Sequence, residues 1–327
     1  GDGSFVDVTT VAGVDDPRWS VSAVFVDYDA DGWLDLYVGN YVDFNYDTHK
    51  PCKSTTSALD YCSPQVFEPE PDSLFRNLGD GRFEAVGATS GVGSKPGAAL
   101  GVGAADFNGD QRVDLYVAND GMANFLWQNQ GDGTFADGAE LAGAAVNMGG
   151  SPEASMGVSA DDFDADGDLD LFMTHLNRET NTLYVNDGRG WFEDRTTSSG
   201  LGEASYAFTG FGTVWLDYDL DGWSDLFIAN GAVTRIEEQV LAGEPYPLKQ
   251  ANQLFRNLSG RSFADVSKSG GDGIAALLVS RGAAAGDLDN DGDTDLVICN
   301  NSGPAQLLSN LLSETRRDHD LAWLGVR

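Results

Sequence analysis

The chain has 327 residues and a formal net charge of −33, from 52 Asp and Glu against 19 Lys and Arg. This charge excludes nucleic acid and anionic membrane surfaces as partners, because binding phosphate groups requires clustered Lys and Arg. No segment approaches the roughly 20 apolar residues that a membrane-spanning helix needs, so we expect no direct membrane insertion.

The first predicted element is a short strand over residues 3–8, and a longer unit of four strands follows over about residues 20–86. In this unit a strand leads into the acidic loop Asp27-Tyr-Asp29-Ala-Asp31-Gly-Trp-Leu-Asp35, and an alternating apolar strand follows the loop. A third strand ends at Asn77, and a Gly-rich hairpin turn precedes a fourth strand that begins at Phe83. Asp-Gly between strands favours the tight turns of hairpins.

The same unit recurs along the chain, over about residues 99–137, 155–195, 210–266 and 280–310. Successive acidic loops begin 79, 56, 55 and 70 residues apart, so the basic period is about 55 residues. Four short antiparallel strands in each of five repeats predict an all-β fold, a β-propeller of five blades. A calcium-binding β-solenoid has a far shorter period and is disfavoured.

The fifth repeat lacks the hairpin and fourth strand after Asn310, and the missing motif stands at the other end of the chain, in Gly1-Asp-Gly-Ser-Phe5. We therefore expect residues 3–8 to complete the last blade and to close the ring, which removes exposed strand edges. Two alternatives stay open. Residues 320–326 supply that strand, or upstream repeats are missing from a chain that starts at Gly1 with no visible signal peptide.

The acidic loops predict about five Ca²⁺ sites, because oxygen ligands at loop positions 1, 3, 5 and 9, with a main-chain carbonyl at position 7, surround one point. The predicted side-chain ligands are Asp27, Asp29, Asp31, Asp35, Asp106, Asn108, Asp110, Asp114, Asp162, Asp164, Asp166, Asp170, Asp217, Asp219, Asp221, Asp225, Asp287, Asp289, Asp291 and Asp295. The predicted carbonyl ligands are those of Trp33, Arg112, Asp168, Trp223 and Asp293.

An EF-hand shares the opening of this pattern but requires a bidentate Glu at position 12 and a helix on each side. Position 12 is apolar in every loop: Val38, Val117, Met173, Ile228 and Ile298. The residues after each loop are β-branched and aromatic, as is typical of strands. The loops therefore join strands, and we expect their ions to have a structural role.

The repeat resembles the FG-GAP/VCBS repeat of integrin-α-like propellers. Blade 2 resembles the ASPIC/UnbV, cartilage acidic protein 1 group of secreted proteins in three segments: Asp114-Leu-Tyr-Val-Ala-Asn119, Asn124 to Asn129 and Gly131-Asp-Gly-Thr-Phe135. The resemblance implies a propeller over residues 1–310, calcium in the loops, and in 311–327 a tail or the start of a truncated ASPIC/UnbV domain. Such propellers commonly have seven blades, which applies here if the chain is cropped. The second loop departs from the pattern at Asn108 and Gln111, which predicts a weaker site.

Cys52 and Cys62 lie in one long insertion, over residues 41–72, and we expect a local disulfide and an oxidising compartment. Cys299 lies in an apolar strand and is predicted to be a buried thiol. A second insertion covers residues 231–251. Both insertions are longer than ordinary hairpin loops, and long loops are often functional.

The blade ends opposite the acidic loops are the predicted ligand face. The second strands end there on polar residues, and one inner strand brings an Arg: Asn40, Asn119, His175, Asn230, Asn300 and Arg281. The first insertion adds Tyr41, Phe44, Tyr46 and Tyr61. The competing interpretation is that strand-end Asn side chains only satisfy turns.

The leading hypothesis is a secreted, calcium-binding module for adhesion or interaction that binds a protein or a glycan; the localisation is extracellular, periplasmic or at the cell surface. The second is an extracellular hydrolase or lyase acting at the propeller mouth, for which no catalytic motif is found. The third is a structural subunit that assembles with copies of itself.

Overall fold

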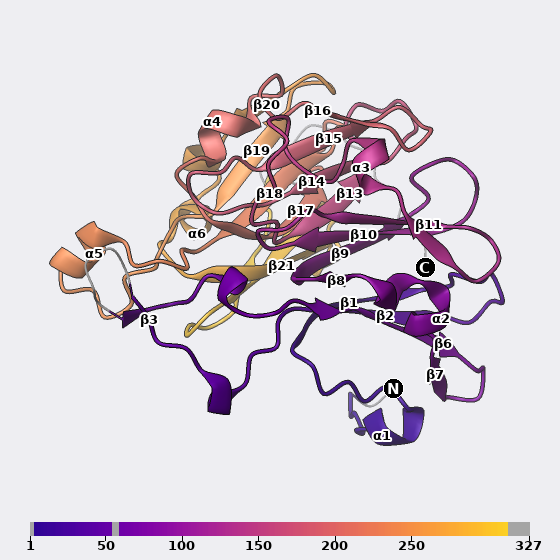
Figure 1. The fold of residues 1–327 in the computed structure, drawn as a ribbon. Coiled ribbons are helices and arrows are strands. Elements are labelled where there is room, and N and C mark those ends of the chain that lie inside the picture. The colour runs from indigo at the N-terminus through magenta and orange to yellow at the C-terminus, as the bar shows by residue number, and fades with distance from the viewer. Residues whose placement is uncertain (1–2, 54–58, 313–327) are drawn as a thin grey trace.

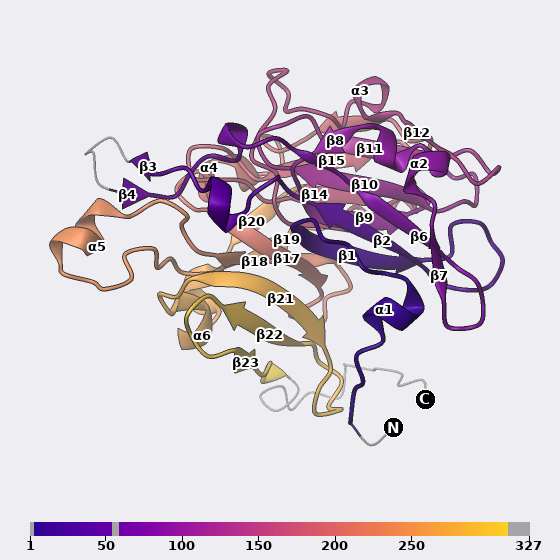
Figure 2. The same ribbon diagram turned by 60° about the horizontal axis from the view of Figure 1, so that its bottom comes forward.

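The computed structural model of the chain describes residues 3–53 and 59–312. Five antiparallel sheets are arranged in a ring around a common centre (Figures 1 and 2). Four of the sheets have four strands, and the fifth has three among the described residues. The all-β, five-bladed propeller predicted from the repeat is therefore confirmed. No helix in the described residues is long and apolar enough to cross a membrane.

Each blade runs in sequence from an inner to an outer strand. Blade 1 contains β1 (Ser20–Val26), β2 (Asp35–Asn40), β6 (Ser73–Asn77) and β7 (Phe83–Ala85). Blade 2 contains β9 (Ala99–Ala105), β10 (Asp114–Asn119), β11 (Phe125–Asn129) and β12 (Phe135–Asp137). Blade 3 contains β13 (Val158–Asp161), β14 (Asp170–Met173), β15 (Thr182–Asn186) and β16 (Phe192–Asp194). Blade 4 contains β17 (Gly210–Leu216), β18 (Asp225–Asn230), β19 (Gln253–Asn257) and β20 (Phe263–Asp265), and blade 5 contains β21 (Ser280–Gly286), β22 (Asp295–Asn300) and β23 (Gln306–Leu308).

Helices are short and lie in the segments outside the blade strands. The α-helices are α1 (Thr9–Ala12), α2 (Gly87–Ser90), α3 (Ala139–Ala142), α4 (Leu201–Ser205), α5 (Glu237–Leu241) and α6 (Asp272–Ala275). The 3₁₀ turns are η1 (Tyr46–Thr48), η2 (Pro64–Val66), η3 (Val92–Ser94) and η4 (Ser267–Ser269). Two small ladders lie outside the blades, β3 (Cys52–Lys53) with β4 (Leu59–Asp60), and β5 (Glu70–Pro71) with β8 (Pro96–Gly97).

Inner strands are rich in Gly and Ala because neighbouring blades approach each other closely at the centre. A Cβ atom added at Gly212 of β17 would lie 2.7 Å from the backbone nitrogen of Ala283 on β21. Added at Gly39 of β2, it would lie 3.1 Å from the Cβ atom of Ala99 on β9. The ends of the five inner strands surround a central cavity of about 440 Å³.

The core lies between blades and uses one recurring aromatic contact. The residue at position 2 of an acidic loop packs against the Phe that begins the outer strand of the next blade. Tyr28 and Phe135 have ring centroids 5.7 Å apart, and Phe163 and Phe263 have centroids 5.8 Å apart. All four side chains are nine-tenths or more buried, so the first and third loops are each fixed to the next blade by a buried ring.

In blades 2 to 5 the Asn at or just after the end of the third strand provides a second link between blades. The side-chain nitrogen of Asn186 donates to the Phe107 carbonyl of blade 2 (2.8 Å) and to the Leu169 carbonyl of its own blade (3.1 Å). Asn129, Asn257 and Asn310 donate in the same way to position 2 of the preceding loop. These Asn residues satisfy main-chain oxygens that would otherwise be buried without a partner.

Two sequence predictions are not met. Residues 3–8 form no strand in this structure, and the Phe5 side chain is 99% exposed, so the expected closing strand is not formed. Cys299 is exposed, which makes the prediction of a buried thiol wrong. The fifth residue of the second strand is buried where a following blade covers it, as at Ala118 in blade 2 and Ala229 in blade 4, both 0% exposed. The alternative closing segment, residues 320–326, lies outside the described residues.

Candidate functional site: acidic loops and an aromatic pocket

Hydrogen bonds to the first Asp shape the acidic loops before any ligand is considered. In the first loop Asp27 accepts from the backbone N–H groups of Asp31 (3.1 Å) and Gly32 (3.0 Å). The first Asp of each of the other four loops accepts from the residues at positions 5 and 6 in the same way. The carboxylate is therefore held at the centre of its own loop.

Each loop requires a left-handed backbone at positions 4 and 6. Ala30 adopts φ = 58° at position 4, and Gly32 adopts φ = 89° at position 6. Gln111 at position 6 of the second loop has φ = 67°, as its place in the repeat predicted. A residue with a Cβ atom adopts this conformation less easily than Gly, so Gln111 costs the second loop some stability.

The Asp at position 9 is buried and holds the loop to its blade. Asp170 is 0% exposed and accepts hydrogen bonds from the backbone N–H groups of Phe163 (3.2 Å) and Asn186 (2.8 Å). Burial raises the pKa of Asp170 to about 7, although both hydrogen bonds oppose the shift. Burial also raises the pKa of Asp225 to about 7 and that of Asp35 to about 6. A nearby cation would stabilise the charged form of each carboxylate.

Four of the five loops bring three carboxylates together, with one oxygen of each within 4.8 Å of the others. The groups are Asp27, Asp29 and Asp35; Asp162, Asp164 and Asp170; Asp217, Asp219 and Asp225; and Asp287, Asp289 and Asp291. In the third loop the buried Oδ1 atom of Asp164 has no hydrogen-bond partner. A buried carboxylate oxygen without a donor fits a metal ligand, so these groups can hold a hard cation.

The other predicted ligands are placed differently. In the first, third and fourth loops the position-5 residues Asp31, Asp166 and Asp221 lie outside the close groups and accept from the backbone N–H of position 7. In the second loop Asn108 replaces a carboxylate, and Arg112 forms a salt bridge with Asp110. A guanidinium group also contacts the fourth loop, where Arg256 forms salt bridges with Asp219 and Asp221, so the weaker second site stays a prediction that rests on Asn108 and Gln111.

The predicted ligand-face Asn residues form hydrogen bonds within their own blades. Asn40, Asn119 and Asn230 are all 0% exposed. The Asn119 side chain donates to the Ala123 carbonyl (2.9 Å), and that of Asn230 donates to the Ala251 carbonyl (3.1 Å). Asn300 is partly exposed and donates to the Pro304 carbonyl (2.9 Å). The structure does not bring this series together around one cavity.

His175 and Arg281 also lie apart from each other. His175 is 1% exposed, its ring nitrogens have no hydrogen-bond partner, and burial lowers its pKa to about 3. Arg281 lines the central cavity, with its guanidinium carbon 4.0 Å from the centre of the Phe211 ring. It donates to the carbonyls of Gly231 and Ala232, and burial lowers its pKa to about 10. A carboxylate oxygen of Glu153 lies 3.8 Å from Nε2 of His175, beyond hydrogen-bond distance.

A larger pocket, of about 660 Å³, lies where the two long insertions meet. Most of its lining is aromatic, proline or aliphatic. Six of the lining residues are the aromatic Trp19, Tyr41, Phe44, Tyr61, Phe67 and Tyr246. Three of the four aromatic residues expected from the first insertion line the pocket; Tyr46 is 92% exposed and packs on Phe44 from outside the lining set.

Trp19 is the centre of the aromatic wall. Its ring lies edge-on to Tyr41, with centroids 5.4 Å apart, and tilted against Phe44 at 5.3 Å. The Tyr41 hydroxyl donates to the Asp120 carboxylate of blade 2 at 2.5 Å, which fixes the wall to the propeller. Burial raises the pKa of Asp120. Trp19 remains 47% exposed, so its ring is accessible to a ligand.

Three pocket residues were not predicted from sequence: Trp19, Phe67 and Tyr246. Trp19 precedes the first inner strand, outside both insertions, and nothing in its neighbourhood marks it. Tyr246 lies between Pro245 and Pro247, and all three line the pocket. This Pro-Tyr-Pro segment is the one sequence signal that a search for exposed aromatic residues could have used.

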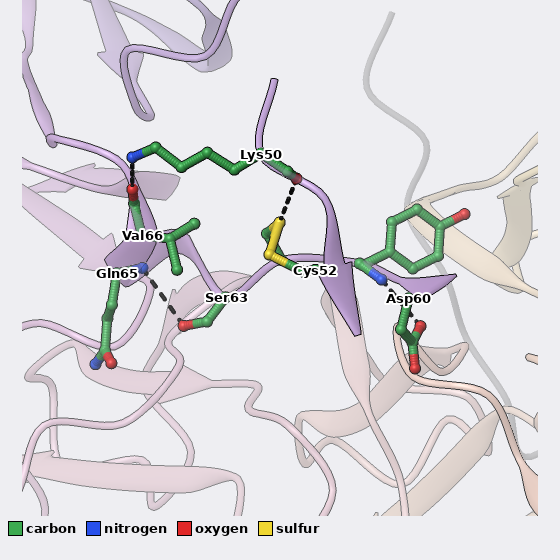
Figure 3. The surroundings of a disulfide bond; sticks show 8 residues. Lys50, Cys52, Asp60, Ser63, Gln65 and Val66 are labelled. Atoms are coloured by element: carbon green, nitrogen blue, oxygen red, sulfur yellow. Dashed lines mark hydrogen bonds between the residues drawn. A yellow bond between two sulfur atoms is a disulfide. The ribbon is translucent and has the colours of Figure 1, made fainter. Parts of the chain in front are cut away.

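The predicted disulfide between Cys52 and Cys62 is present, and Cys62 lies in the pocket lining. The bond links Cys52 of β3 to Cys62, two residues after the end of β4. Figure 3 shows its surroundings, where Lys50 reaches across to the Val66 carbonyl and Ser63 accepts from the backbone N–H of Gln65. The bond closes a short loop and limits the conformations of the insertion in the unfolded chain. It therefore helps to hold one side of the pocket in place.

Comparison with known proteins agrees with the repeat. The model of the FG-GAP-like repeat family matches residues 66–117, 106–173 and 162–228. Cartilage acidic protein 1 of Mus musculus is 27% identical over 309 residues, which cover 93% of this chain and 42% of that protein. The Homo sapiens protein is 26% identical over 294 residues, 88% of this chain and 39% of that protein. The chain thus spans about two fifths of the length of these relatives.

Among solved structures, a lectin of Agrocybe aegerita that recognises non-reducing terminal N-acetylglucosamine matches 90% of this chain and 67% of its own, with 17% identity and a TM-score of 0.42. The exotype rhamnogalacturonan lyase YesX matches 89% of this chain and 45% of its own, with 15% identity and the same TM-score, 0.42. The repeat, the blades and the relatives agree: the chain is a β-propeller built of FG-GAP-like repeats and is homologous to cartilage acidic protein 1.

Proposed function

We propose that this chain is a secreted binding module, stabilised by calcium, that binds a protein segment in the aromatic pocket between its two insertions. The pocket carries the proposal. It is concave and mostly apolar, it is fixed by a disulfide and by the Tyr41–Asp120 hydrogen bond, and it carries only a few polar groups. These are the properties of a preformed ligand site.

A protein segment fits the pocket better than a glycan, because a sugar carries many hydroxyl groups that need hydrogen-bond partners. The lining offers few such partners, with Asp60, His49 and Arg235 as its titratable side chains apart from the Tyr hydroxyls. Aromatic rings and prolines in a groove are typical of sites for proline-rich segments, which bind in an extended form at low entropic cost. The strongly acidic chain favours a ligand with positive charges.

Calcium and secretion form the second part of the proposal. The four close carboxylate groups support a hard divalent cation with oxygen ligands, and we assign it as Ca²⁺, with the second loop as a weaker fifth site. The disulfide supports an oxidising compartment outside the cytosol. Extracellular calcium modules bind with dissociation constants of ~10⁻⁴–10⁻³ M, so millimolar calcium would stabilise each site by about 0.5–1.5 kcal/mol.

The pocket is tested by selecting peptides from a displayed library on the calcium-loaded protein and on its Trp19→Ala variant. We expect proline-containing, basic sequences that bind the parent chain and lose at least tenfold in affinity to the variant, since aromatic anchors dominate such interfaces. Trp191→Ala is the matched control, because Trp191 is 57% exposed on the outer hairpin of blade 3 and does not line the pocket.

A glycan array run on the same three proteins separates the alternative ligand. Glycan binding that depends on Trp19, with no selected peptide, would replace the protein ligand by a sugar. Peptides that bind all three proteins equally would show that the pocket is not the binding site.

A further inference from the structure

The fourth acidic loop already contacts a cationic side chain of its own blade. Arg256 lies on β19, and its Nε atom is 2.8 Å from the Asp219 carboxylate, while its Nη2 atom is 2.8 Å from the Asp221 carboxylate. Asp219 belongs to the close group of three carboxylates in this loop, with Asp217 and Asp225. A guanidinium group therefore contacts the carboxylates that we assign to a calcium ion.

The pairing of β19 with β20 explains why Arg256 contacts the loop. The residue directly opposite Arg256 on β20 is Ala264, which carries no charge. In blade 1 the same position of the third strand is Arg76, and the residue opposite it is Glu84. These two residues form a salt bridge of 2.7 Å, as is typical of opposite charges directly across two antiparallel strands. Ala264 offers no such partner, so the guanidinium group of Arg256 lies on the loop instead.

The third loop provides a matched comparison. Val185 holds the position of Arg256 in blade 3, opposite Glu193, and a Val side chain cannot neutralise a carboxylate. Asp164 holds the position of Asp219, and its buried Oδ1 atom has no hydrogen-bond partner. Of these two equivalent loops, the fourth is the one in which a guanidinium group forms salt bridges with the carboxylates.

The second loop differs from the fourth in the carboxylate that its arginine contacts. Arg112 forms a salt bridge with Asp110, at loop position 5. Arg256 contacts loop position 3 as well. Position 3 contributes to every close carboxylate group: Asp29, Asp164, Asp219 and Asp289. A cation at the close group of the fourth loop must therefore compete with Arg256 for a carboxylate.

Arg256 is held loosely enough to be displaced. Its side chain is 41% exposed, whereas the Asp219 side chain is 13% exposed. Salt bridges at a surface are weak, because solvent screens them and the side chains lose conformational freedom. A calcium ion carries twice the charge of a guanidinium group and takes several oxygen ligands at once. It can therefore displace the Arg256 side chain into solvent while the backbone of β19 keeps its pairing.

We propose, on the basis of the calcium binding proposed above, that Arg256 is an internal counter-ion of the fourth loop, which calcium displaces at concentrations above those that load the third loop. The fourth loop is then a calcium-responsive switch. At low calcium its carboxylates hold Arg256, and at high calcium they hold the ion and release a positive side chain. Two partly exposed ion pairs lower the calcium affinity of this loop about threefold to thirtyfold relative to the same loop without Arg256.

Labelling of arginine side chains with phenylglyoxal, mapped by peptide mass spectrometry, tests the release directly. We expect calcium to raise the labelling rate of Arg256 by about threefold to thirtyfold, since the reagent reacts with the released side chain. Arg76 is the control, because its side chain is 43% exposed and its salt bridge is with Glu84 rather than with a loop; its rate should not change. If calcium raises the melting temperature of the chain and leaves the Arg256 rate unchanged, the proposal is wrong. If calcium leaves the melting temperature unchanged, calcium binding itself is refuted.

Terbium(III) reports the ion affinity of the fourth loop, because it takes the oxygen ligands of calcium and luminesces when an indole ring beside it absorbs light. Position 7 carries a Trp in the first and fourth loops, Trp33 and Trp223. In a Trp33→Phe background the signal excited through position 7 comes from the fourth loop. The measured quantity is the terbium concentration at half-saturation.

Two substitutions in this background test the competition. Arg256→Gln removes the guanidinium group, and Ala264→Glu gives Arg256 the cross-strand partner that it lacks. Each should lower the terbium concentration at half-saturation by about threefold to thirtyfold. Ala136→Glu is the matched control, because the residue opposite Ala136 is Gln128, which carries no charge; it should leave the half-saturation unchanged. The same half-saturation in all of these proteins would overturn the proposal.

The melting temperature without calcium gives an independent test. In EGTA, Asp164→Asn should raise it, because the third loop loses a repulsive charge. Asp219→Asn should raise it less, because the loss of an ion pair with Arg256 offsets the relief of repulsion. In an Arg256→Gln background the two substitutions should have the same effect, as a double-mutant cycle measures. An equal rise for both substitutions in the parent chain would show that Arg256 does not neutralise the fourth loop, and the proposal would fail.

Discussion

Asp164 offers the sharpest test of the acidic loops, because its replacement by Asn should have different effects with and without calcium. Asp164→Asn keeps the size of the side chain and removes one charge. Without calcium, the third loop loses a repulsive charge; with calcium present, it also loses a ligand. The melting temperature should therefore rise in EGTA, and added calcium should raise it less in the variant than in the parent chain.

The magnitude follows from the spacing of the carboxylates. Two charges 4.8 Å apart repel each other by about 3–4 kcal/mol at an effective dielectric constant of ~20. Because Asp164 is partly exposed, solvent screening reduces the net relief to roughly 1–2 kcal/mol. A domain of this size shifts by about 2–4 °C per kcal/mol, so the variant should melt about 2–5 °C higher in EGTA. In millimolar calcium the variant lacks the contribution of one site, so the rise in melting temperature that calcium causes should be about 1–5 °C smaller than in the parent chain.

Differential scanning calorimetry of the parent chain, the variant and a control decides the matter. Glu193→Gln is the control, because Glu193 lies in the same blade, loses the same charge and is exposed on the surface. It should shift little and by the same amount in both buffers. If Asp164→Asn also shifts the melting temperature equally with and without calcium, the third loop does not bind the ion.

Three further predictions concern stability. Asn186→Ala should lower the free energy of unfolding in urea by about 2–4 kcal/mol, because it leaves two carbonyls without a donor. Asn77→Ala removes one such bond at the junction of blades 5 and 1 and should lower the free energy of unfolding by about 1 kcal/mol. Equal losses in the two variants would contradict the inter-blade role. His175 takes up a proton below pH ~6.5 only in the unfolded chain, so its contribution to the free energy of unfolding should fall by about 2 kcal/mol from pH 6.5 to pH 5, measured as the difference in pH dependence between the parent chain and His175→Phe. Replacing Cys52 and Cys62 by Ser should lower the free energy of unfolding by about 3 kcal/mol through loop entropy, and it should weaken peptide binding at the pocket. Unchanged peptide binding would show that the disulfide does not shape the pocket.

Local patterns predicted most of the fold. Alternating apolar residues after each loop, small residues before it and a Gly-rich turn before Phe83 or Phe135 each specify one strand or hairpin from a few neighbouring residues. The repetition of the pattern then indicated the architecture, because five copies of one four-stranded unit are typical of a β-propeller. The predicted local disulfide was found for the same reason, since Cys52 and Cys62 are close in sequence.

The candidate site was predicted only in part. The two insertions and three of their aromatic residues were expected near one mouth, and the structure confirms that they line one pocket. Trp19 and Tyr246 reach the same pocket from positions more than 200 residues apart, and no local pattern relates them. The sequence could not distinguish whether the strand-end Asn residues bind a ligand or satisfy turns. In the structure they are buried, and the side chains of Asn119 and Asn230 donate to carbonyls of their own blades.

By itself the sequence determined the repeat, its strands and the five acidic loops, because each depends on residues a few positions apart. Only the tertiary structure decided which three carboxylates of a loop come together, which aromatic residues share a pocket, and that Cys299 and Phe5 are exposed. These properties depend on whether a neighbouring blade covers a given surface. The same strand pattern is buried in blades 2 and 4 and open in blade 5, so sequence periodicity could not distinguish them.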